Sequence, residues 1–398
     1  MSEGEEPMRL LVLSGDFGDG HKQAAVALRE ACGAQGQRMQ ADIVDFTQQV
    51  YPRLHPVMRY SFLKGVEKLP SVYGYFFHRT RHTEGLSAPF RMFLELGLGR
   101  LAALIEERSP DAVICTFPLA AAAVSLLKER GQLKVPLVTV ITDHTDHSLW
   151  MNPGTDLYLT GSAEAAAALR RRGVHQSAVR VTGIPVRPRF GEPGERDALR
   201  RRFGLRPELP VVLVMGGGSG MLAKEVRRLL RSEGLYERLQ LVLICGSNEG
   251  LRTDFERAAR GWPPDRVFVL GYVEEIHEWM AAADLLLTKP GGLTTTEAVT
   301  MGLPMLLVKP IPGQEEDNAE VLVKAGVAAR ASDARGLREQ LLELLGHPDA
   351  LERMRTEALR IRPVRSAERA LESIAQLLVE TRLLAEPELE PAAALRVQ

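Results

Sequence analysis

Short apolar runs alternate with helical patterns over most of this chain. Each run ends in a glycine-rich or polar loop, and a segment rich in alanine, leucine and charged residues follows. Bounded apolar runs are typical of buried strands, and their alternation with helices predicts an α/β fold with parallel sheets. The expected strands include residues 9–14, 41–46, 110–116, 135–142, 210–215, 239–246, 267–270 and 284–288.

A unit of strand, glycine loop and helix begins twice along the chain. Residues 9–14 lead into the loop Gly15–His21, and residues 210–215 lead into the loop Gly216–Gly220. This doubling predicts two Rossmann-like domains. The first loop does not have the GxGxxG spacing, so it does not predict a dinucleotide site. We place the domain boundaries as follows: tail 1–8, first domain 9–186, charged linker 187–209 rich in glycine and proline, second domain 210–362, helix 363–384 and tail 385–398.

The composition narrows the functional classes. The 398 residues carry a formal net charge of −1, which gives the chain as a whole no electrostatic preference for nucleic acid. Cys32, Cys115 and Cys245 lack metal-ligand or disulfide spacing, which suits a reducing cytoplasm. The acidic N-terminus is unlike a secretory signal, and no apolar run reaches the roughly 18 residues that span a bilayer. We therefore expect a cytoplasmic protein whose membrane contact is peripheral.

Two polar loops in the second half predict one ligand site. Pro290-Gly291-Gly292 ends a strand, and Thr294 and Glu297 have the spacing of a capping box. This places Glu297 in the first helical turn, ionised and able to bind a vicinal diol such as a ribose, although a cap alone would explain it. A second loop, residues 310–318, follows the next strand; alone, it would suggest a solvated helix start. Together the loops lie at the carboxyl edge of a parallel sheet, where open α/β folds bind ligands.

Several segments resemble one enzyme family. TKPGGLTTTEA (288–298) and PIPGQEEDNA (310–319) are similar to the donor-sugar half of the monogalactosyldiacylglycerol synthase family. Its relatives include the processive diacylglycerol glucosyltransferases and the peptidoglycan N-acetylglucosaminyltransferase. GDFGDGHKQAA (15–25), TDHTDHSLW (142–150) and GIPVR (183–187) follow the family's order. The resemblance implies a GT-B architecture of two facing Rossmann-like domains with a cleft between them, and a C-terminal helix that returns to the first domain.

His21 is the candidate catalytic base. It stands where the first glycine loop meets a helix, and a neutral imidazole there could accept a proton near pH 7. A structural helix cap is the alternative. The resemblance implies the role of general base, with Gly18 and Gly20 in the loop around it. Further along, two aspartates and two histidines stand close together, but their spacing matches no strong zinc motif. The resemblance instead places Asp143 and His147 at the cleft, where they orient His21 or contact the acceptor.

The donor site is expected in the second domain. The GGGSG loop lets backbone amides approach a diphosphate, although a tight turn would also use glycines. The resemblance implies that Arg187 reaches the donor, that residues 271–273 follow the uracil edge, and that Gln314 and Glu315 hold the hexose. The predicted donor residues are Gly216, Gly217, Gly218, Ser219, Gly220, Arg187, Tyr272, Val273, Gly291, Gly292, Thr294, Thr295, Glu297, Gln314, Glu315 and Asn318. No Asp-x-Asp motif occurs, so we expect no metal and no cofactor besides the UDP-sugar substrate.

Residues 51–93 interleave aromatic and basic side chains. This composition favours contact with a membrane surface or a lipid acceptor, and the resemblance supports that interpretation. The alternative is a helical lid over the first domain; a nucleic-acid interface has no recognisable module here. The candidate contact residues are Arg59, Tyr60, Phe62, Tyr75, Phe76 and Phe77.

The resemblance implies an inverting glycosyltransferase that moves a hexose from a UDP-sugar to diacylglycerol. Three alternatives stay open: a UDP-N-acetylglucosamine transferase of the peptidoglycan type, a UDP-sugar epimerase, and a non-catalytic protein that binds sugar nucleotides or membranes. The motifs do not distinguish a glucose donor from a galactose donor.

Overall fold

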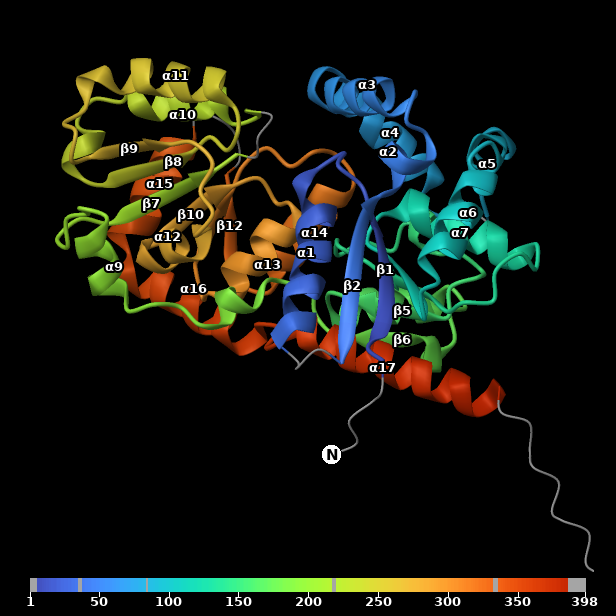
Figure 1. Cartoon of the computed structure of the whole chain (residues 1–398). Coiled ribbons are helices and arrows are strands. Elements are labelled where there is room, and N and C mark those ends of the chain that lie inside the picture. The colour runs from blue at the N-terminus through green and yellow to red at the C-terminus, as the bar shows by residue number, and fades with distance from the viewer. Residues whose placement is uncertain (1–5, 35–37, 84, 217–219, 332–335, 386–398) are drawn as a thin grey trace, which may run out of the picture.

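The computed structural model describes residues 6–34, 38–83, 85–216, 220–331 and 336–385. Two parallel sheets, each covered by helices on both faces, lie side by side (Figure 1). This is the α/β architecture that the apolar runs predict. The inner strands of both sheets are buried on both faces, which explains why their sequences read as continuous apolar runs.

The first sheet has the strand order β2-β1-β3-β4-β5-β6, with every pair parallel. The order reverses between β1 and β3, so the loops after these two strands diverge and leave a crevice at their carboxyl ends. The loop that carries His21 follows β1. The strands are β1 (Met8–Ser14), β2 (Met39–Asp45), β3 (Ala112–Cys115), β4 (Leu137–Val140), β5 (Leu157–Thr160) and β6 (Val179–Val181).

The second sheet has the order β12-β11-β10-β7-β8-β9, also parallel throughout. Counted within this sheet, it is the strand order typical of dinucleotide-binding folds, and its reversal lies between β7 and β10. Both loops predicted to hold the donor diphosphate and ribose start from this pair. The strands are β7 (Val211–Met215), β8 (Gln240–Ile244), β9 (Val267–Leu270), β10 (Leu285–Thr288), β11 (Met305–Leu307) and β12 (Ala328–Arg330).

Eight described α-helices belong to the first domain, and three of them, α3 to α5, come from the aromatic and basic segment 51–93. Figure 1 shows α3 and α4 above the first sheet, at the level of α10 and α11 on the second domain. The helices are α1 (Asp19–Ala34), α2 (Phe46–Val50), α3 (His55–Lys68), α4 (Pro70–Thr80), α5 (Ala88–Glu95), α6 (Leu98–Arg108), α7 (Pro118–Glu129) and α8 (Ala163–Arg171).

The second domain holds the next eight α-helices. The segment 187–209, which separates the two sheets in sequence, is itself folded onto this domain: Phe190 and Leu199 lie in its core, and Arg200 pairs with Asp284. The helices are α9 (Arg196–Arg202), α10 (Ala223–Leu230), α11 (Glu249–Ala258), α12 (Ile276–Ala282), α13 (Gly292–Thr300), α14 (Gln314–Lys324), α15 (Gly336–Gly346) and α16 (Pro348–Ile361). Short 3₁₀ turns occupy Ser148–Trp150, Gln176–Ala178, Pro188–Gly191, Leu235–Glu237 and Ala259–Gly261.

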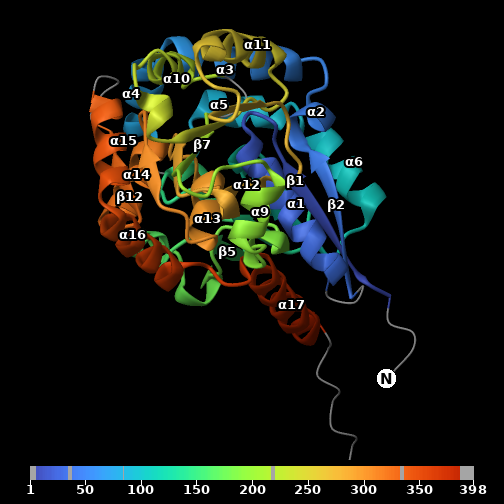
Figure 2. The ribbon, with the colours of Figure 1, turned by 90° about the vertical axis from the view of Figure 1, so that its left-hand side faces the viewer.

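The last helix, α17 (Ser366–Ala385), crosses back to the first sheet and forms the lower edge of the molecule (Figures 1 and 2). Leu371 and Ile374 are fully buried there against the strand core. The chain passes between the domains twice, once after Gly183 and once near Pro363, and these two segments are in contact. A Cβ on Gly183, whose φ is +85°, would stand 2.3 Å from Cβ of Pro363, so only glycine fits at this crossing.

No described helix is both long enough and apolar enough to cross a lipid bilayer.

Candidate active site

The crevices of the two sheets face each other across the domain junction. Helix α1 follows the first crevice, helix α13 follows the second, and the two helices are in contact. At the closest approach, a Cβ on Gly292 would lie 2.0 Å from the carbonyl oxygen of Thr142. Only glycine can start α13 at this distance. The first helical turn of the second domain therefore abuts the loop after β4 of the first domain.

His21 is held at this junction by three elements. It lies in the first turn of α1, and its Nδ1 is 3.0 Å from Oγ1 of Thr142. Thr116, at the end of β3, donates its hydroxyl to the backbone carbonyl of His21 over 3.0 Å. The imidazole packs against Phe117 and Trp150, with ring centroids 5.3 and 6.1 Å apart. These contacts fix both the backbone and the ring of His21.

Burial keeps the imidazole of His21 neutral. Desolvation lowers its pKa to about 4, although a hydrogen bond between the ring and the backbone of Thr116 partly opposes this shift. When Nδ1–H donates to Thr142, Nε2 is the ring nitrogen that carries no proton. His21 therefore presents one unprotonated ring nitrogen at neutral pH, which a general base requires.

Thr142, the residue before Asp143, contacts the ring of His21, while Oδ1 of Asp143 accepts a hydrogen bond of 2.9 Å from Nδ2 of Asn318. The two predicted roles of Asp143, orienting His21 and contacting the acceptor, stay predictions. Asn318 is fully buried, and it also accepts from the backbone N–H of His144 at 2.7 Å and donates to the Pro290 carbonyl at 3.0 Å. Asn318 thus joins the two domains. Its predicted contact with the donor stays a prediction.

His147 supports helix α4. Its Nδ1 accepts from the backbone N–H of Leu149 at 3.1 Å, and its Nε2 lies 3.1 Å from the carbonyl oxygen of Phe77. The ring is buried and stacks near the ring of Phe77, at a centroid distance of 4.3 Å. Because both ring nitrogens have protein partners, this geometry favours a holding role over proton transfer. The predicted catalytic role of His147 stays untested.

Glu297 is not a helix cap. Helix α13 begins at Gly292 with Gly291 as its N-cap, so Thr294 lies inside the first turn and Glu297 in the second. Glu297 is only 7% exposed, and burial raises its pKa to about 8, with Arg187 opposing the shift. This raised pKa favours the protonated carboxyl near pH 7 over the ionised carboxylate that the sequence predicted, and the contact of Glu297 with a ribose stays a prediction. Thr295 is also buried and donates its hydroxyl to the carbonyl of Gly291 at 2.8 Å.

Arg187 lies at the domain junction near Glu297. Its Nε donates to Oε1 of Glu30, in α1, over 2.9 Å, and its NH2 group contacts the same oxygen. The same guanidinium acts electrostatically on Glu297 in the second domain. Arg187 therefore lies between the base-bearing helix and the donor domain, while its charge is already paired.

The loop before α14 is tied by side chains on both of its sides. Glu315 is buried; it pairs with Lys289 and accepts from the backbone N–H of Ile311 at 3.0 Å. Gln314 accepts a hydrogen bond of 2.8 Å from the hydroxyl of Tyr73, in α4. The loop is thus fixed from β10 through Lys289 and from the first domain through Tyr73.

The glycine loops are described in part. Gly216 is buried after β7, and Gly220 has a φ of +72°, a conformation that favours glycine; Gly217, Gly218 and Ser219 lie outside the described residues. Around the base, Gly18 has open space at its Cβ position and Gly20 approaches Leu293. After β9, Tyr272 is 70% exposed and Val273 is half-buried.

The predicted membrane residues divide between two environments. Tyr60, Tyr75 and Phe76 are 60–66% exposed. Phe62 instead stacks on Phe17 at 5.5 Å, and Phe77 is buried. Three of the five predicted aromatics are therefore exposed, whereas Phe62 and Phe77 pack against other rings, and the contact of the set with a membrane or lipid acceptor stays a prediction. Arg59 is half-exposed and pairs with Asp16 over 3.0 Å.

Helix α4 is wedged between the domains and does not cover the first domain alone. A Cβ on Gly74 would lie 2.4 Å from Cβ of Pro312, and a Cβ on Gly313 would lie 2.7 Å from the ring of Phe77. Just after α4, Arg81 donates to Asp146 at 2.8 Å and to Asp317 at 2.9 Å. The segment therefore contacts both halves of the predicted site.

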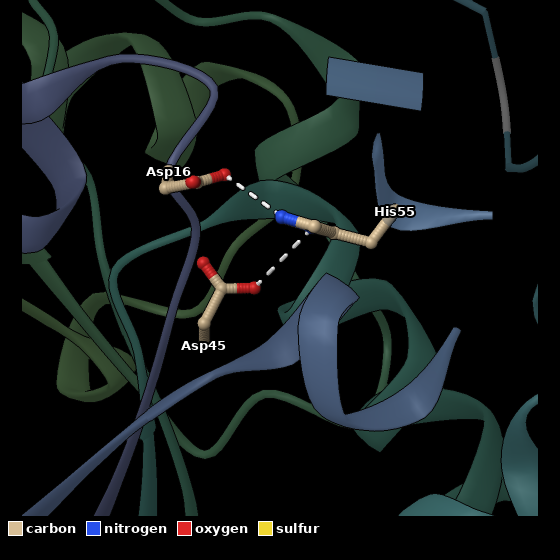
Figure 3. A group of neighbouring side chains, drawn as sticks. All are labelled: Asp16, Asp45 and His55. Carbon is tan, nitrogen blue, oxygen red and sulfur yellow. Dashed lines mark ion pairs between the residues drawn. The ribbon is translucent and has the colours of Figure 1, made fainter. Parts of the chain in front are cut away.

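One group of described residues has the donor atoms for a metal ion. Atoms of Asp16, Asp45 and His55 lie within 4.8 Å of one another, and His55 points between the two carboxylates (Figure 3). Each group already has a protein partner. Thr47 is 2.9 Å from Nδ1 of His55, Asp45 caps α2, and Asp16 pairs with Arg59. These contacts indicate that the cluster connects the first glycine loop to α3 through hydrogen bonds and ion pairs. The expectation of no required metal stays a prediction.

Several residues that build this site were not predicted from the sequence. Thr142 ends the apolar run before Asp143 and so lies at a strand end, like the loops that were predicted. Tyr73, Arg81 and Glu30 act across the domain junction, and no local pattern distinguishes them. Lys289 stands inside the quoted motif, but its partner Glu315 is fixed only by the fold.

Comparison with known proteins agrees with this architecture. Residues 21–186 match the family model of monogalactosyldiacylglycerol (MGDG) synthase, and residues 211–377 match that of the glycosyltransferase family 28 C-terminal domain. The processive diacylglycerol beta-glucosyltransferase of Bacillus subtilis (strain 168) is 32% identical over 366 residues, which cover 92% of this chain and 94% of that protein. The enzyme of the same name from Bacillus pumilus (strain SAFR-032) is 31% identical over 371 residues, with the same coverage of 92% and 94%.

Solved structures share the fold at lower identity. Acinetobacter baumannii MurG superposes with a TM-score of 0.58 at 16% identity, over 93% of this chain and 100% of that one. The complex of S. aureus MnaA with UDP gives a TM-score of 0.63 at 16% identity, over 94% of this chain and 97% of that one. These likenesses confirm the GT-B fold. With the family matches and the relatives that cover nearly the whole chain, they show that the protein belongs to the glycosyltransferase family of the monogalactosyldiacylglycerol synthases and processive diacylglycerol glucosyltransferases.

Proposed function

We propose that this chain transfers a hexose from a UDP-sugar to the free hydroxyl of diacylglycerol and forms a glycosyldiacylglycerol with inversion at the anomeric carbon. The observation that carries the proposal is the position of His21, a neutral imidazole that lies where α1 meets α13. The names of the relatives support the acceptor class, and the family 28 match supports a sugar-nucleotide donor.

The reaction is a single displacement. Nε2 of His21 takes the proton of the acceptor hydroxyl while that oxygen forms a bond to the anomeric carbon. The bond from that carbon to the UDP oxygen breaks, and UDP leaves with its electron pair. Backbone N–H groups at the start of α13 and in the loop after β7 would stabilise the departing diphosphate. Both lie where the strand order of the second sheet reverses, between β7 and β10.

The remaining donor contacts follow from the buried polar groups around α13 and α14. Glu297, protonated at pH 7, would donate as well as accept a hydrogen bond at the ribose diol. Gln314 and Glu315 would bind the hexose hydroxyls. The pairing of Glu315 with Lys289 fixes the carboxylate before any ligand arrives.

The acceptor would enter along α3 and α4. A cleft of about 610 Å³ lies between α3 and the second domain, lined by residues that include Asp16, Arg59, Tyr60 and Asn248. The exposed rings of Tyr60, Tyr75 and Phe76 would contact the lipid surface, as amphipathic aromatic side chains do at membrane interfaces. The protein would then act as a peripheral enzyme on the inner face of the cell membrane.

The test measures UDP release from UDP-glucose, UDP-galactose and UDP-N-acetylglucosamine, with and without diacylglycerol in mixed micelles. We expect lipid-dependent release from one hexose donor. His21→Ala should reduce it by about 10²- to 10⁴-fold, the usual contribution of a positioned general base. His175→Ala removes an exposed histidine far from the junction and should change nothing.

Other outcomes would contradict the proposal. Use of UDP-N-acetylglucosamine alone, without any response to diacylglycerol, would favour a peptidoglycan-type transferase. Interconversion of sugar nucleotides without acceptor would indicate an epimerase. Binding of UDP without turnover of any donor would leave a non-catalytic role.

A further inference from the structure

Tyr73 connects the acceptor side of the molecule to the donor loop. It lies in α4, within the insert of the first domain, and its hydroxyl donates to Oε1 of Gln314 over 2.8 Å. Gln314 is the first residue of α14 and lies at the carboxyl edge of the second sheet. The two residues are 241 positions apart in sequence. This hydrogen bond therefore exists only when the insert is docked on the donor domain.

The packing around this hydrogen bond restricts Tyr73. Its ring lies between the rings of Phe62 and Phe77, at centroid distances of 6.0 and 6.4 Å. On either side of the donor loop, Gly74 faces Pro312 and Gly313 faces Phe77 at distances that leave no room for a Cβ. Gly313 also has a φ of +108°, which other residues rarely adopt. Helix α4 and the donor loop thus pack side chain against glycine backbone at both places, and the phenol has little freedom to turn away.

The chemistry of the phenol sets the orientation of the amide. Burial raises the pKa of Tyr73 to about 12, so its hydroxyl keeps its proton and can donate at any physiological pH. Because Oε1 of Gln314 accepts this hydrogen bond, the amide oxygen faces Tyr73 in the insert. The Nε2 group then points away from Tyr73, and no described residue accepts its hydrogen atoms. An oriented amide with two free N–H groups remains at the edge of the sheet.

We propose that Tyr73 is a positioning residue for the donor hexose: its hydroxyl holds Gln314 so that the amide N–H groups face the sugar. A residue of the acceptor-side insert thereby contributes to the choice of donor sugar. The inference rests on the proposed function, because the contact of Gln314 with the hexose belongs to that proposal. Hexoses such as glucose and galactose differ in the direction of one hydroxyl, and a fixed polar partner discriminates against the epimer that leaves it unpaired.

The first experiment measures equilibrium binding of UDP, UDP-glucose and UDP-galactose to wild type and Tyr73→Phe. Binding of UDP should change by less than about twofold. The affinity for the preferred UDP-hexose should fall about tenfold, the size expected when one hydrogen bond to the sugar is lost, and the preference between the two hexoses should shrink. Tyr236→Phe, which removes a hydroxyl from a half-buried tyrosine of the second domain, should leave all three affinities unchanged.

A double-mutant cycle separates positioning from general packing. Gln314→Ala should cause a similar loss of hexose affinity, and adding Tyr73→Phe to it should cost nothing further, because both changes remove one unit. Equal weakening of UDP and UDP-hexose, an unchanged hexose preference in Tyr73→Phe, or additive losses in the double variant would each overturn the proposal.

The binding assay also separates this inference from the proposed function. Wild type that distinguishes the hexoses, and loses that distinction in Tyr73→Phe, would support the positioning role even if no hexose reached diacylglycerol. Lipid-dependent transfer with no effect of Tyr73→Phe on donor choice would support the function and overturn the inference.

Discussion

Each sheet has a switch point, the place where its strand order reverses: between β1 and β3 in the first sheet and between β7 and β10 in the second. The two switch points face each other but supply different groups. The first presents a side chain: His21, whose ring is fixed by Thr142, Phe117 and Trp150. The second presents mainly backbone, with glycines at 216, 220, 291 and 292 next to the start of α13. A reactive side chain needs a defined tautomer and position, whereas a diphosphate needs N–H groups that no Cβ obstructs. The difference shows how one α/β architecture, used twice, can supply the base from one domain and the binding site for the leaving group from the other.

The same comparison explains why the two buried ionisable groups, both neutral, have opposite hydrogen-bonding roles. Burial removes the proton-bound, charged form of His21 and the ionised form of Glu297 alike. Both groups are therefore neutral near pH 7. The first is left as a proton acceptor, and the second as a hydrogen-bond donor.

Breaking the contact between the switch points should have the largest effect. In Gly292→Ala the new Cβ would meet the Thr142 carbonyl at 2.0 Å, so α13 must move away from the base. A displacement of about 1 Å between reacting groups costs about 100-fold in rate, and we expect a loss of this size in kcat/KM with diacylglycerol. Gly99→Ala, in open space on α6, is the matched control. Full activity of Gly292→Ala would show that the domain junction in this structure is not the reacting geometry.

The orientation of the base should matter less than its presence. Thr142→Val keeps the shape of the side chain but removes the oxygen that lies 3.0 Å from Nδ1 of His21. We expect kcat to fall about tenfold, the effect of one lost hydrogen bond of about 1.4 kcal/mol, with little change in affinity for UDP. Thr142→Ser restores a hydroxyl and should recover much of the rate. Equal rates in Thr142→Val and wild type would mean that packing alone orients the imidazole.

The last prediction concerns stability rather than rate and sharpens the second half of the comparison. The folded pKa of Glu297, about 8, lies above the ordinary value of 4.5, so the folded chain keeps a proton that the unfolded chain loses between these values. This stabilising contribution is present below pH 4.5 and is lost as pH rises toward 8, at no more than about 1.4 kcal/mol per pH unit. Glu297→Gln does not titrate. Denaturant unfolding at pH 5, 6 and 7 should show the wild type declining relative to the variant, whereas parallel curves would contradict the burial of a neutral carboxyl.

Sequence analysis predicted the architecture because each strand, glycine loop and helix is encoded locally. The doubled unit indicated two domains, and His21 stood in the first loop. The capping box at Thr294 and Glu297 failed because α13 begins earlier, at Gly292, with Gly291 as its N-cap. The nearby Thr142 carbonyl requires glycine at position 292, and this tertiary contact cannot be read from local sequence.

The partners that complete the site could not be predicted for a related reason. Thr142 lies 121 positions from His21, and Tyr73 lies 241 positions from Gln314. Hydrogen bonds across such separations leave no periodicity in the sequence. The aromatic segment shows the same limit, because its composition indicated a surface, while packing decided that Phe62 and Phe77 turn inward.

The most direct test of this division of labour measures two properties of His21→Ala together: the equilibrium affinity for UDP and the rate of diacylglycerol-dependent UDP release from the preferred UDP-hexose. The account predicts unchanged UDP affinity, because the second switch point binds the nucleotide, and a rate at least about 100-fold lower. A variant that keeps the wild-type rate, or that loses UDP affinity and rate to the same extent, would contradict the assignment of the base to the first switch point.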